Sequence, residues 1–255
     1  MAASLTLTAL DGIPTIEPGA DLAAMIVEAS ARSGVTLQDG DVLALAQKIV
    51  SKAEGRFRRL AEVTASPRAI ELGKEADKDP RLVELILGES IEVLRCRPGA
   101  IIVAHRLGFV LANAGIDASN VEGEPEETVL LLPADPDGSA QRLRGDLKRL
   151  TGTEVGVLIN DSFGRAWRMG TTGTAIGIAG LPGLLDLRGQ PDRNGRILKV
   201  TEVGIGDELA AAASLLMGQA AEGQPVIHIR GFPYGRRAGK AAELIRPKEM
   251  DLFRK

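Results

Sequence analysis

The chain has 255 residues, of which 44% are hydrophobic and 25% are charged, and its formal net charge at pH 7 is -3. This length allows one large domain or two modest ones, and the small negative charge provides no long-range attraction for nucleic acid. Aromatic residues make up only 3% of the chain, which argues against a base-stacking platform for single-stranded nucleic acid.

Cysteine content and hydropathy indicate a cytoplasmic protein. The single cysteine, Cys96, cannot form an internal disulfide, and no Cys/His cluster indicates a zinc site. Residues 1–14 lack the features of a signal peptide, and no apolar run approaches the roughly 20 residues that span a bilayer. We therefore expect no membrane partner, and a single domain over residues 1–255 with a loosely ordered tail from about residue 235.

The first elements are a strand and a helix. Residues 5–8 alternate between Leu and Thr and predict a strand, and residues 12–14 predict a turn. Apolar residues then recur at helical spacing after Asp21, and Gly34 ends the pattern.

A buried strand with a basic end follows. The apolar residues 42–46 predict a strand that is covered on both faces. Residues 47–56 carry Lys48 and Lys52, and cations at the end of a buried strand can neutralise phosphate oxygens. A solvated strand end is the alternative, since lysines are mostly exposed.

Residues 66–104 predict two helices and a hairpin. Ser66 and Asp79 each precede a proline and an apolar stripe, which predicts two helix starts. Strands are expected at 91–94 and 100–104.

The stretch 108–121 predicts a strand that ends at Asp117, followed by Ser119 and Asn120. These residues can form an Asx-turn. Alternatively, Asp117 can meet a second carboxylate at the same edge of a sheet and bind a divalent ion.

The next residues predict a strand, a turn and a helix. The strand is expected at 128–132 and the turn at 133–138, and Ser139 is predicted to cap a helix through Leu150.

The central stretch, residues 156–180, carries the strongest chemical signal. A buried strand at 157–159 is predicted to break at 160–165, where Asp161 and Ser162 provide oxygen ligands of the kind that Mg²⁺ or Mn²⁺ prefers. Arg165 and Arg168 can reach phosphate or carboxylate oxygens. A capped turn with solvated arginines is the alternative.

The last third predicts a strand at 197–205, a helix capped by Asp207 that ends at Met217, and a strand at 225–230. His105 and His228 lie in predicted strands. Either can serve as a general base, but we interpret both as ordinary strand residues.

Several stretches together resemble one family. Residues 160–180, NDSFGRAWRMGTTGTAIGIAG, are similar to the central motif of the coenzyme F420-0:gamma-glutamyl ligase family. The same family is matched by the stretches IPTI, KIVSKAEGR and ANAGIDASN, and the matches span residues 12–232. The chain has no P-loop and no dinucleotide-binding glycine motif.

The resemblance implies an unusual mixed α+β fold in an intertwined homodimer. It also implies that GTP phosphorylates the terminal carboxylate of the deazaflavin coenzyme F420-0, and that the amine of L-glutamate attacks the acyl phosphate. Two Mn²⁺ or Mg²⁺ ions and activation by K⁺ belong to the same expectation. A metal-dependent nucleotide phosphohydrolase and a non-catalytic guanine-nucleotide or deazaflavin carrier remain as alternatives.

The resemblance also implies roles for individual residues. The expected metal ligands are Asp117, Asp161, Ser162 and Gln219, and the expected catalytic residues are Asp117, Asp161 and Arg165. The expected nucleotide contacts are Ile13, Pro14, Thr15, Ile16, Gln47, Lys48, Lys52, Asn120, Met217, Gly218, Ala220, Ala221, Glu222, Gly223 and Gln224. The chain departs from the family where Gln47 and Lys48 occupy the positions of a Ser-Thr pair, and the amide of Gln219 is a weaker ligand than a carboxylate.

Overall fold

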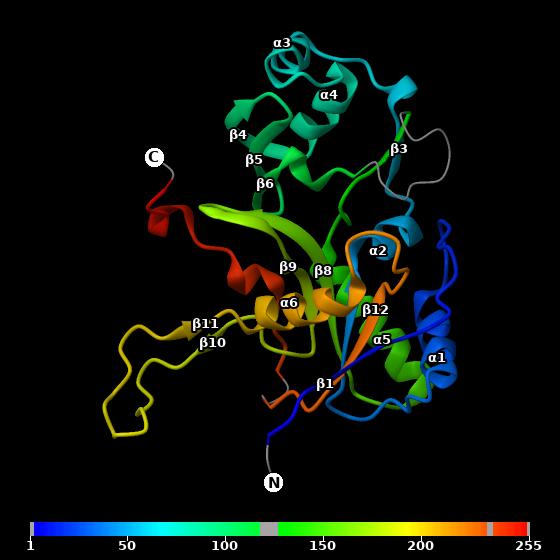
Figure 1. The fold of residues 1–255 in the computed structure, drawn as a ribbon, viewed down its shortest axis with the longest axis vertical. Helices are drawn as coiled ribbons and strands as arrows, with labels where there is room; N and C mark the ends of the chain where they lie inside the picture. The colour runs from blue at the N-terminus through cyan, green and yellow to red at the C-terminus, as the bar shows by residue number, and fades with distance from the viewer. Residues whose placement is uncertain (1–2, 118–126, 234–236, 254–255) are drawn as a thin grey trace.

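The computed structural model describes residues 3–117, 127–233 and 237–253. A five-stranded sheet forms the body, and a smaller lobe stands beside it (Figure 1). The strands follow the order β1-β12-β2-β8-β9, and among them only β2 and β8 pair in parallel. Their bounds are Thr6–Ala9 for β1, Val226–Arg230 for β12, Val42–Ala46 for β2, Gly156–Arg165 for β8 and Arg168–Ala179 for β9.

Helices cover both faces of this sheet, so the body has three layers. Leu43 and Leu45 pack with α1 (Leu22–Arg32) and α5 (Pro136–Thr151) in one core. The alternate side chain of Ala44 belongs to a second core with α6 (Ile205–Met217). Successive side chains of β2 therefore point alternately into the two cores. This confirms the prediction that β2 is buried on both faces. The mixed α+β class is also confirmed.

The smaller lobe has a core of its own. It comprises α3 (Pro67–Ala76), α4 (Pro80–Gly88) and the sheet β4-β5-β6, with bounds Ser90–Arg97, Ala100–His105 and Val110–Ala112. The two predicted helix starts are confirmed, because Ser66 Oγ accepts from Ala69 N and Asp79 Oδ1 accepts from Arg81 N. A ribbon of β3 (Phe57–Arg59) and β7 (Thr128–Leu130) and the 3₁₀ turns η1 (Leu60–Glu62) and η2 (Asn113–Gly115) complete this region.

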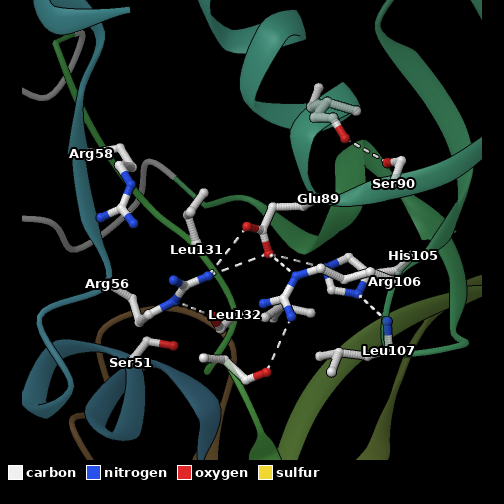
Figure 2. A network of polar contacts seen from close by, with 12 residues as sticks. Ser51, Arg56, Arg58, Glu89, Ser90, His105, Arg106, Leu107, Leu131 and Leu132 are labelled. Atoms are coloured by element: carbon white, nitrogen blue, oxygen red, sulfur yellow. Dashed lines mark hydrogen bonds and ion pairs between the residues drawn. The ribbon is translucent and has the colours of Figure 1, made fainter.

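A carboxylate on the lobe holds the lobe against the body (Figure 2). Glu89 Oε2 lies 2.9 Å from Arg106 Nε and 3.3 Å from Arg56 Nη2. Arg56 Nε also donates to the carbonyl of Leu132, at 2.8 Å. Burial alone would raise the pKa of Glu89, but His105, Arg106 and Arg56 outweigh it and lower the pKa to about 2. Partners from two segments, Arg56 and the adjacent pair His105 and Arg106, therefore meet at one anion.

The central motif differs from its prediction. β8 does not break at residue 160; it runs from Gly156 to Arg165 and pairs with β9 as far as Arg168. Asp161 therefore lies within an antiparallel strand, although its parallel neighbour β2 ends opposite Asn160. Pairing along the hairpin overrides the turn preference of the Asn-Asp-Ser-Phe-Gly sequence.

Several helix boundaries also differ. The predicted turn at 133–138 is wrong, because Asp135 caps α5 by accepting from Gly138 N and Pro136 is its first residue. α6 begins at Ile205, so Asp207 lies in its first turn and accepts from Ala175 N instead of capping the helix. α2 (Gln47–Ala53) follows β2 directly, where the sequence predicted only the basic end of a strand.

The last segments contain little strand. The strand predicted at 197–205 is reduced to β11 (Glu202–Val203), which pairs with β10 (Leu185–Asp186) in a ribbon that projects from the body (Figure 1). The tail contains η3 (Ala241–Leu244) and η4 (Lys248–Met250). Ala241 is buried, and its N–H donates to Asp137 Oδ1 at 2.8 Å, so this part of the tail docks firmly.

A buried ion cluster at the start of β2 gives a prediction about stability. Asp41 Oδ2 lies 2.7 Å from Arg230 Nη2 and 2.8 Å from His228 Nε2. His228 therefore has a structural partner, as its interpretation as an ordinary strand residue requires. Burial would raise the pKa of Asp41, but hydrogen bonds from Arg230 and His228 lower it below its usual value.

We expect Asp41→Asn to lower the free energy of unfolding by about 1–3 kcal/mol at pH 7, because it removes the charge that pairs with Arg230. A lowered folded pKa stabilises the fold above the unfolded value, and this stabilisation disappears as the pH falls through the folded value. Urea unfolding at pH 7 and pH 3 should therefore show a smaller difference from wild type at pH 3. Glu28→Gln, in an exposed pair with Arg32, is the control, and an equal loss in both variants would contradict the prediction.

Candidate functional site

A cavity of about 760 Å³ lies where the parallel pairing of β2 and β8 ends, at Ala46 and Asn160. Five segments that are far apart in the sequence form its wall: residues 13–16 before α1, the end of β2 with helix α2, Asp117, strand β8, and the end of α6 with the loop after it. The lining residues are Ile13, Pro14, Thr15, Ile16, Ala46, Gln47, Lys48, Ile49, Lys52, Asp117, Asn160, Asp161, Ser162, Met217, Gly218, Gln219, Ala220, Glu222, Gly223, Gln224 and Pro225. Open α/β sheets place ligands at such an edge.

Two carboxylates on this wall influence each other. Burial raises the pKa of Asp161 to about 6, and the charge of Asp117 adds to the rise. The backbone N–H of Ser162, 2.8 Å from Asp161 Oδ1, and the charge of Lys48 oppose it. Asp117 is held from the other side, because its backbone N–H and carbonyl both bond to Leu130. Like charges that raise each other's pKa in this way favour a proton or a cation at the site.

Helix α2 brings two lysines to the same wall. Lys48 and Lys52 are four residues apart and therefore share one face of the helix. Lys48 Nζ lies 2.8 Å from Asp117 Oδ2. The neighbouring Gln47 is 3% exposed, and its Nε2 donates to Ser51 Oγ at 2.6 Å. The helix therefore presents cations to the cavity, while the amide nitrogen of Gln47 is used inside the protein.

The loop after α6 closes the opposite side. Gly218 has φ +72° and ψ -176°, a conformation that is essentially restricted to glycine. A Cβ at this position would overlap the carboxylate of Glu222, which accepts from Ala220 N at 2.8 Å. The path of the loop past the cavity therefore depends on Gly218.

The oxygen atoms at the acidic end fit a hard divalent cation. Two carboxylates, the hydroxyl of Ser162 and the amide oxygen of Gln219 line one cavity. Gln219 Nε2 donates to Ser214 Oγ at 3.2 Å, so the amide oxygen is the atom available as a ligand. Within the described residues, no group of three or more His, Cys, Asp or Glu side chains is arranged to hold a metal ion by itself. Mg²⁺ is commonly held by one or two carboxylates together with substrate phosphates, and this donor set suits that arrangement.

Two of the predicted site residues that the structure describes are not found in this wall, and a third lies outside the described residues. Arg165 is exposed at the end of the β8–β9 hairpin, where its Nη2 donates to the carbonyl of Met169. Ala221 lies in the loop after α6 but is not among the lining residues. Asn120 falls outside the described residues.

The sequence interpretation missed Asn160. Its side chain is 4% exposed at the cavity wall and donates from Nδ2 to Met217 Sδ at 3.2 Å. Its position could have indicated a role in the site, because Asn160 comes immediately before Asp161 at the end of an apolar run. A polar residue in such a run is buried with a partner or faces a site.

Known proteins resemble this sequence over almost its whole length. Residues 12–231 match the family described as F420-0:gamma-glutamyl ligase. The coenzyme F420:L-glutamate ligase of Methanothermobacter thermautotrophicus is 46% identical over 98% of this chain and 99% of its own length. Those of Methanopyrus kandleri and Archaeoglobus fulgidus are 47% and 44% identical, over 94% and 96% of this chain and 93% and 95% of their own lengths.

Proposed function

Because the chain belongs to the F420-0:gamma-glutamyl ligase family, we propose that it joins L-glutamate to coenzyme F420-0 in a GTP-dependent reaction. The observation that carries the proposal is the electrostatic coupling of Asp117 and Asp161 in a cavity that Lys48 and Lys52 also line. This combination supplies anionic ligands for divalent cations and cations for a triphosphate.

The proposed reaction has two steps. A carboxylate oxygen of F420-0 attacks the γ-phosphorus of GTP, which releases GDP and leaves an acyl phosphate. The amine of glutamate then attacks the acyl carbon, a proton leaves the nitrogen, and the amide forms as inorganic phosphate departs. Further glutamates would be added through gamma-glutamyl linkages. Positioning and charge neutralisation lower the barrier, so no protein nucleophile is required.

Different residues of the cavity are proposed to bind the metal ions and the nucleotide. Asp117, Asp161, Ser162 and Gln219 would hold two Mn²⁺ or Mg²⁺ ions, which polarise phosphoryl oxygens when bound. Lys48 and Lys52 would neutralise phosphate oxygens, and the backbones of 13–16 and 217–224 would surround the nucleotide. The catalytic role of Arg165 stays a prediction. Activation of the enzyme by K⁺ also stays a prediction.

Incubation with GTP, Mn²⁺, F420-0 and glutamate, followed by mass analysis, tests the proposal. We expect stepwise additions of one glutamate residue with matching release of GDP. GDP without adducts would indicate a phosphohydrolase. Unchanged GTP with measurable nucleotide binding would indicate a carrier, and either result would overturn the ligase assignment.

The loop after α6 provides a test of nucleotide binding. We expect Gly218→Ala to weaken GDP binding about tenfold, because a side chain cannot adopt this conformation beside Glu222. Isothermal titration with GDP measures the effect. Gly145→Ala, at an exposed position of α5 with open space around it, is the control and should leave GDP affinity unchanged. Equal affinities in the two variants would contradict a role for this loop.

The homodimer also belongs to the proposal. Trp167 and Met169 on the β8–β9 hairpin are 80% and 94% exposed, and Val200 on the projecting ribbon is 84% exposed. Large exposed apolar side chains are typical of surfaces that another chain covers. Light scattering should give twice the chain mass of 26.8 kDa.

Within the described residues no helix is long and apolar enough to cross a bilayer, and the cytoplasmic location stays a prediction.

A further inference from the structure

One ion pair in the cavity joins a cation to a proposed metal ligand. Lys48 Nζ lies 2.8 Å from Asp117 Oδ2, and the two side chains are 30% and 32% exposed. The charge of Lys48 also acts on Asp161. Two carboxylates and one ammonium thus share one wall, and their formal charges sum to -1, where the carboxylates alone would carry -2.

This contact opposes the binding of a divalent ion. The ammonium occupies one acceptor site of Asp117 Oδ2, and its positive charge repels a divalent ion at the same carboxylate, so withdrawal of Lys48 makes Asp117 a better metal ligand. The flexible four-carbon stem of lysine permits that movement. Because Lys48 also lines the cavity proposed for the triphosphate, a phosphate oxygen is an alternative partner for its ammonium.

We propose that the Lys48 ammonium is a built-in counter-ion that competes with a divalent cation for Asp117, so that a nucleotide raises metal affinity by drawing Lys48 onto its phosphates. The inference rests on the proposed nucleotide and metal site. Coupling of this kind is reciprocal, so the metal also raises the affinity for the nucleotide. The ion pair thereby favours binding of the two ligands together over binding of the metal alone.

Lys52 provides the comparison that separates this contact from a general field effect. It lies one helical turn after Lys48 and lines the same cavity. No ion pair of Lys52 occurs within the described ranges. A neutral replacement of either lysine removes one positive charge near the carboxylates, but only the replacement of Lys48 removes an ammonium from Asp117.

The test measures Mn²⁺ binding by isothermal titration in the absence of nucleotide. Wild type, Lys48→Met, Lys52→Met and Asp161→Asn are compared, after thermal unfolding has shown that each variant is folded. We expect Lys48→Met to bind Mn²⁺ about tenfold more tightly than wild type. Lys52→Met should change the dissociation constant less than threefold, and Asp161→Asn should lose the site.

A second titration adds saturating GDP. The gain in Mn²⁺ affinity that GDP produces should be about tenfold smaller in Lys48→Met than in wild type, because the variant has no ammonium to displace. Equal Mn²⁺ affinities of wild type and Lys48→Met without nucleotide would overturn the inference, as would equal gains with GDP. If glutamate adducts still form in that case, the proposed function survives. Conversely, the expected affinities without glutamate adducts would support the counter-ion and overturn the ligase.

Discussion

Asp161→Asn is expected to abolish ligation and, at the same time, to stabilise the metal-free protein. The activity should fall about a thousandfold or more, because the substitution removes one of two charges that would hold the divalent ions against the phosphates. The amide keeps the size of the side chain and an oxygen that can accept from Ser162 N. Loss of charge, and not loss of shape, would therefore be the cause.

The stability effect follows from the raised pKa. Burial raises the pKa of Asp161 to about 6, above the ordinary value of 3.8. Between these values the folded protein binds more protons than the unfolded chain, so ionisation of Asp161 costs stability progressively as the pH rises from about 4 to 6. The full cost is present above pH 6. Asparagine does not ionise, so Asp161→Asn should raise the free energy of unfolding at pH 7 by up to about 3 kcal/mol.

Two measurements check this prediction. Mass analysis quantifies glutamate addition at saturating Mn²⁺, and urea unfolding in chelator at pH 4.5 and 7.5 quantifies stability. Asp146→Asn, in a half-exposed pair with Arg149 on α5, is the control and should change neither quantity strongly. A variant that keeps Mn²⁺-dependent ligation would exclude Asp161 from the metal site. A variant less stable than wild type at pH 7.5 would show that Asp161 serves mainly to support the fold.

Local signals in the sequence were sufficient for much of the fold. The starts of α1, α3 and α4 follow from a capping Asp or Ser, and these caps form hydrogen bonds within three residues. The two-sided burial of β2 follows from an uninterrupted apolar run. Errors arose where one sequence satisfies two local rules. Asp135-Pro136-Asp137-Gly138 suits a turn as well as a helix start, and the latter wins because α5 packs on the sheet.

Most of the candidate site could not be predicted from local sequence signals, because its residues come from segments that are distant in the sequence. Residues 13–16 lie at a predicted turn and residues 217–224 follow the predicted end of a helix, and only the family resemblance indicated that both segments border a binding site. The ion pair between Lys48 and Asp117 joins segments that are distant in the sequence, so neither segment reveals it alone. The same holds for Glu89, whose partners Arg56 and Arg106 lie 33 and 17 residues away.

Glu89→Ala should cause the largest loss of stability that we predict. The side chains of Glu89 and Arg56 are only 15% and 14% exposed, so the substitution leaves the charge of Arg56 largely buried without its anion. Breaking a buried pair in this way typically costs about 3–5 kcal/mol. Because the folded pKa of Glu89 is about 2, its stabilising effect is present above the ordinary value of 4.5 and disappears as the pH falls toward 2.

Urea unfolding at pH 7 and pH 3 measures this loss, which should shrink at pH 3. Glu62→Ala removes an exposed carboxylate that lies 4.0 Å from Arg59 and should cost less than about 0.5 kcal/mol. Equal losses in the two variants would show that the Glu89 network contributes no more than a surface pair.

The same variant tests how the lobe is coupled to the cavity. Glu89 reaches the body through Arg56, which bonds to Leu132, two residues beyond the residue that pairs with Asp117. If this connection keeps lobe and body in one cooperative unit, amide hydrogen exchange in Glu89→Ala should rise first in residues 67–105 and remain slow in β2 and β8. Uniform acceleration across both regions would instead mean that the variant lowers global stability without separating the lobe from the sheet.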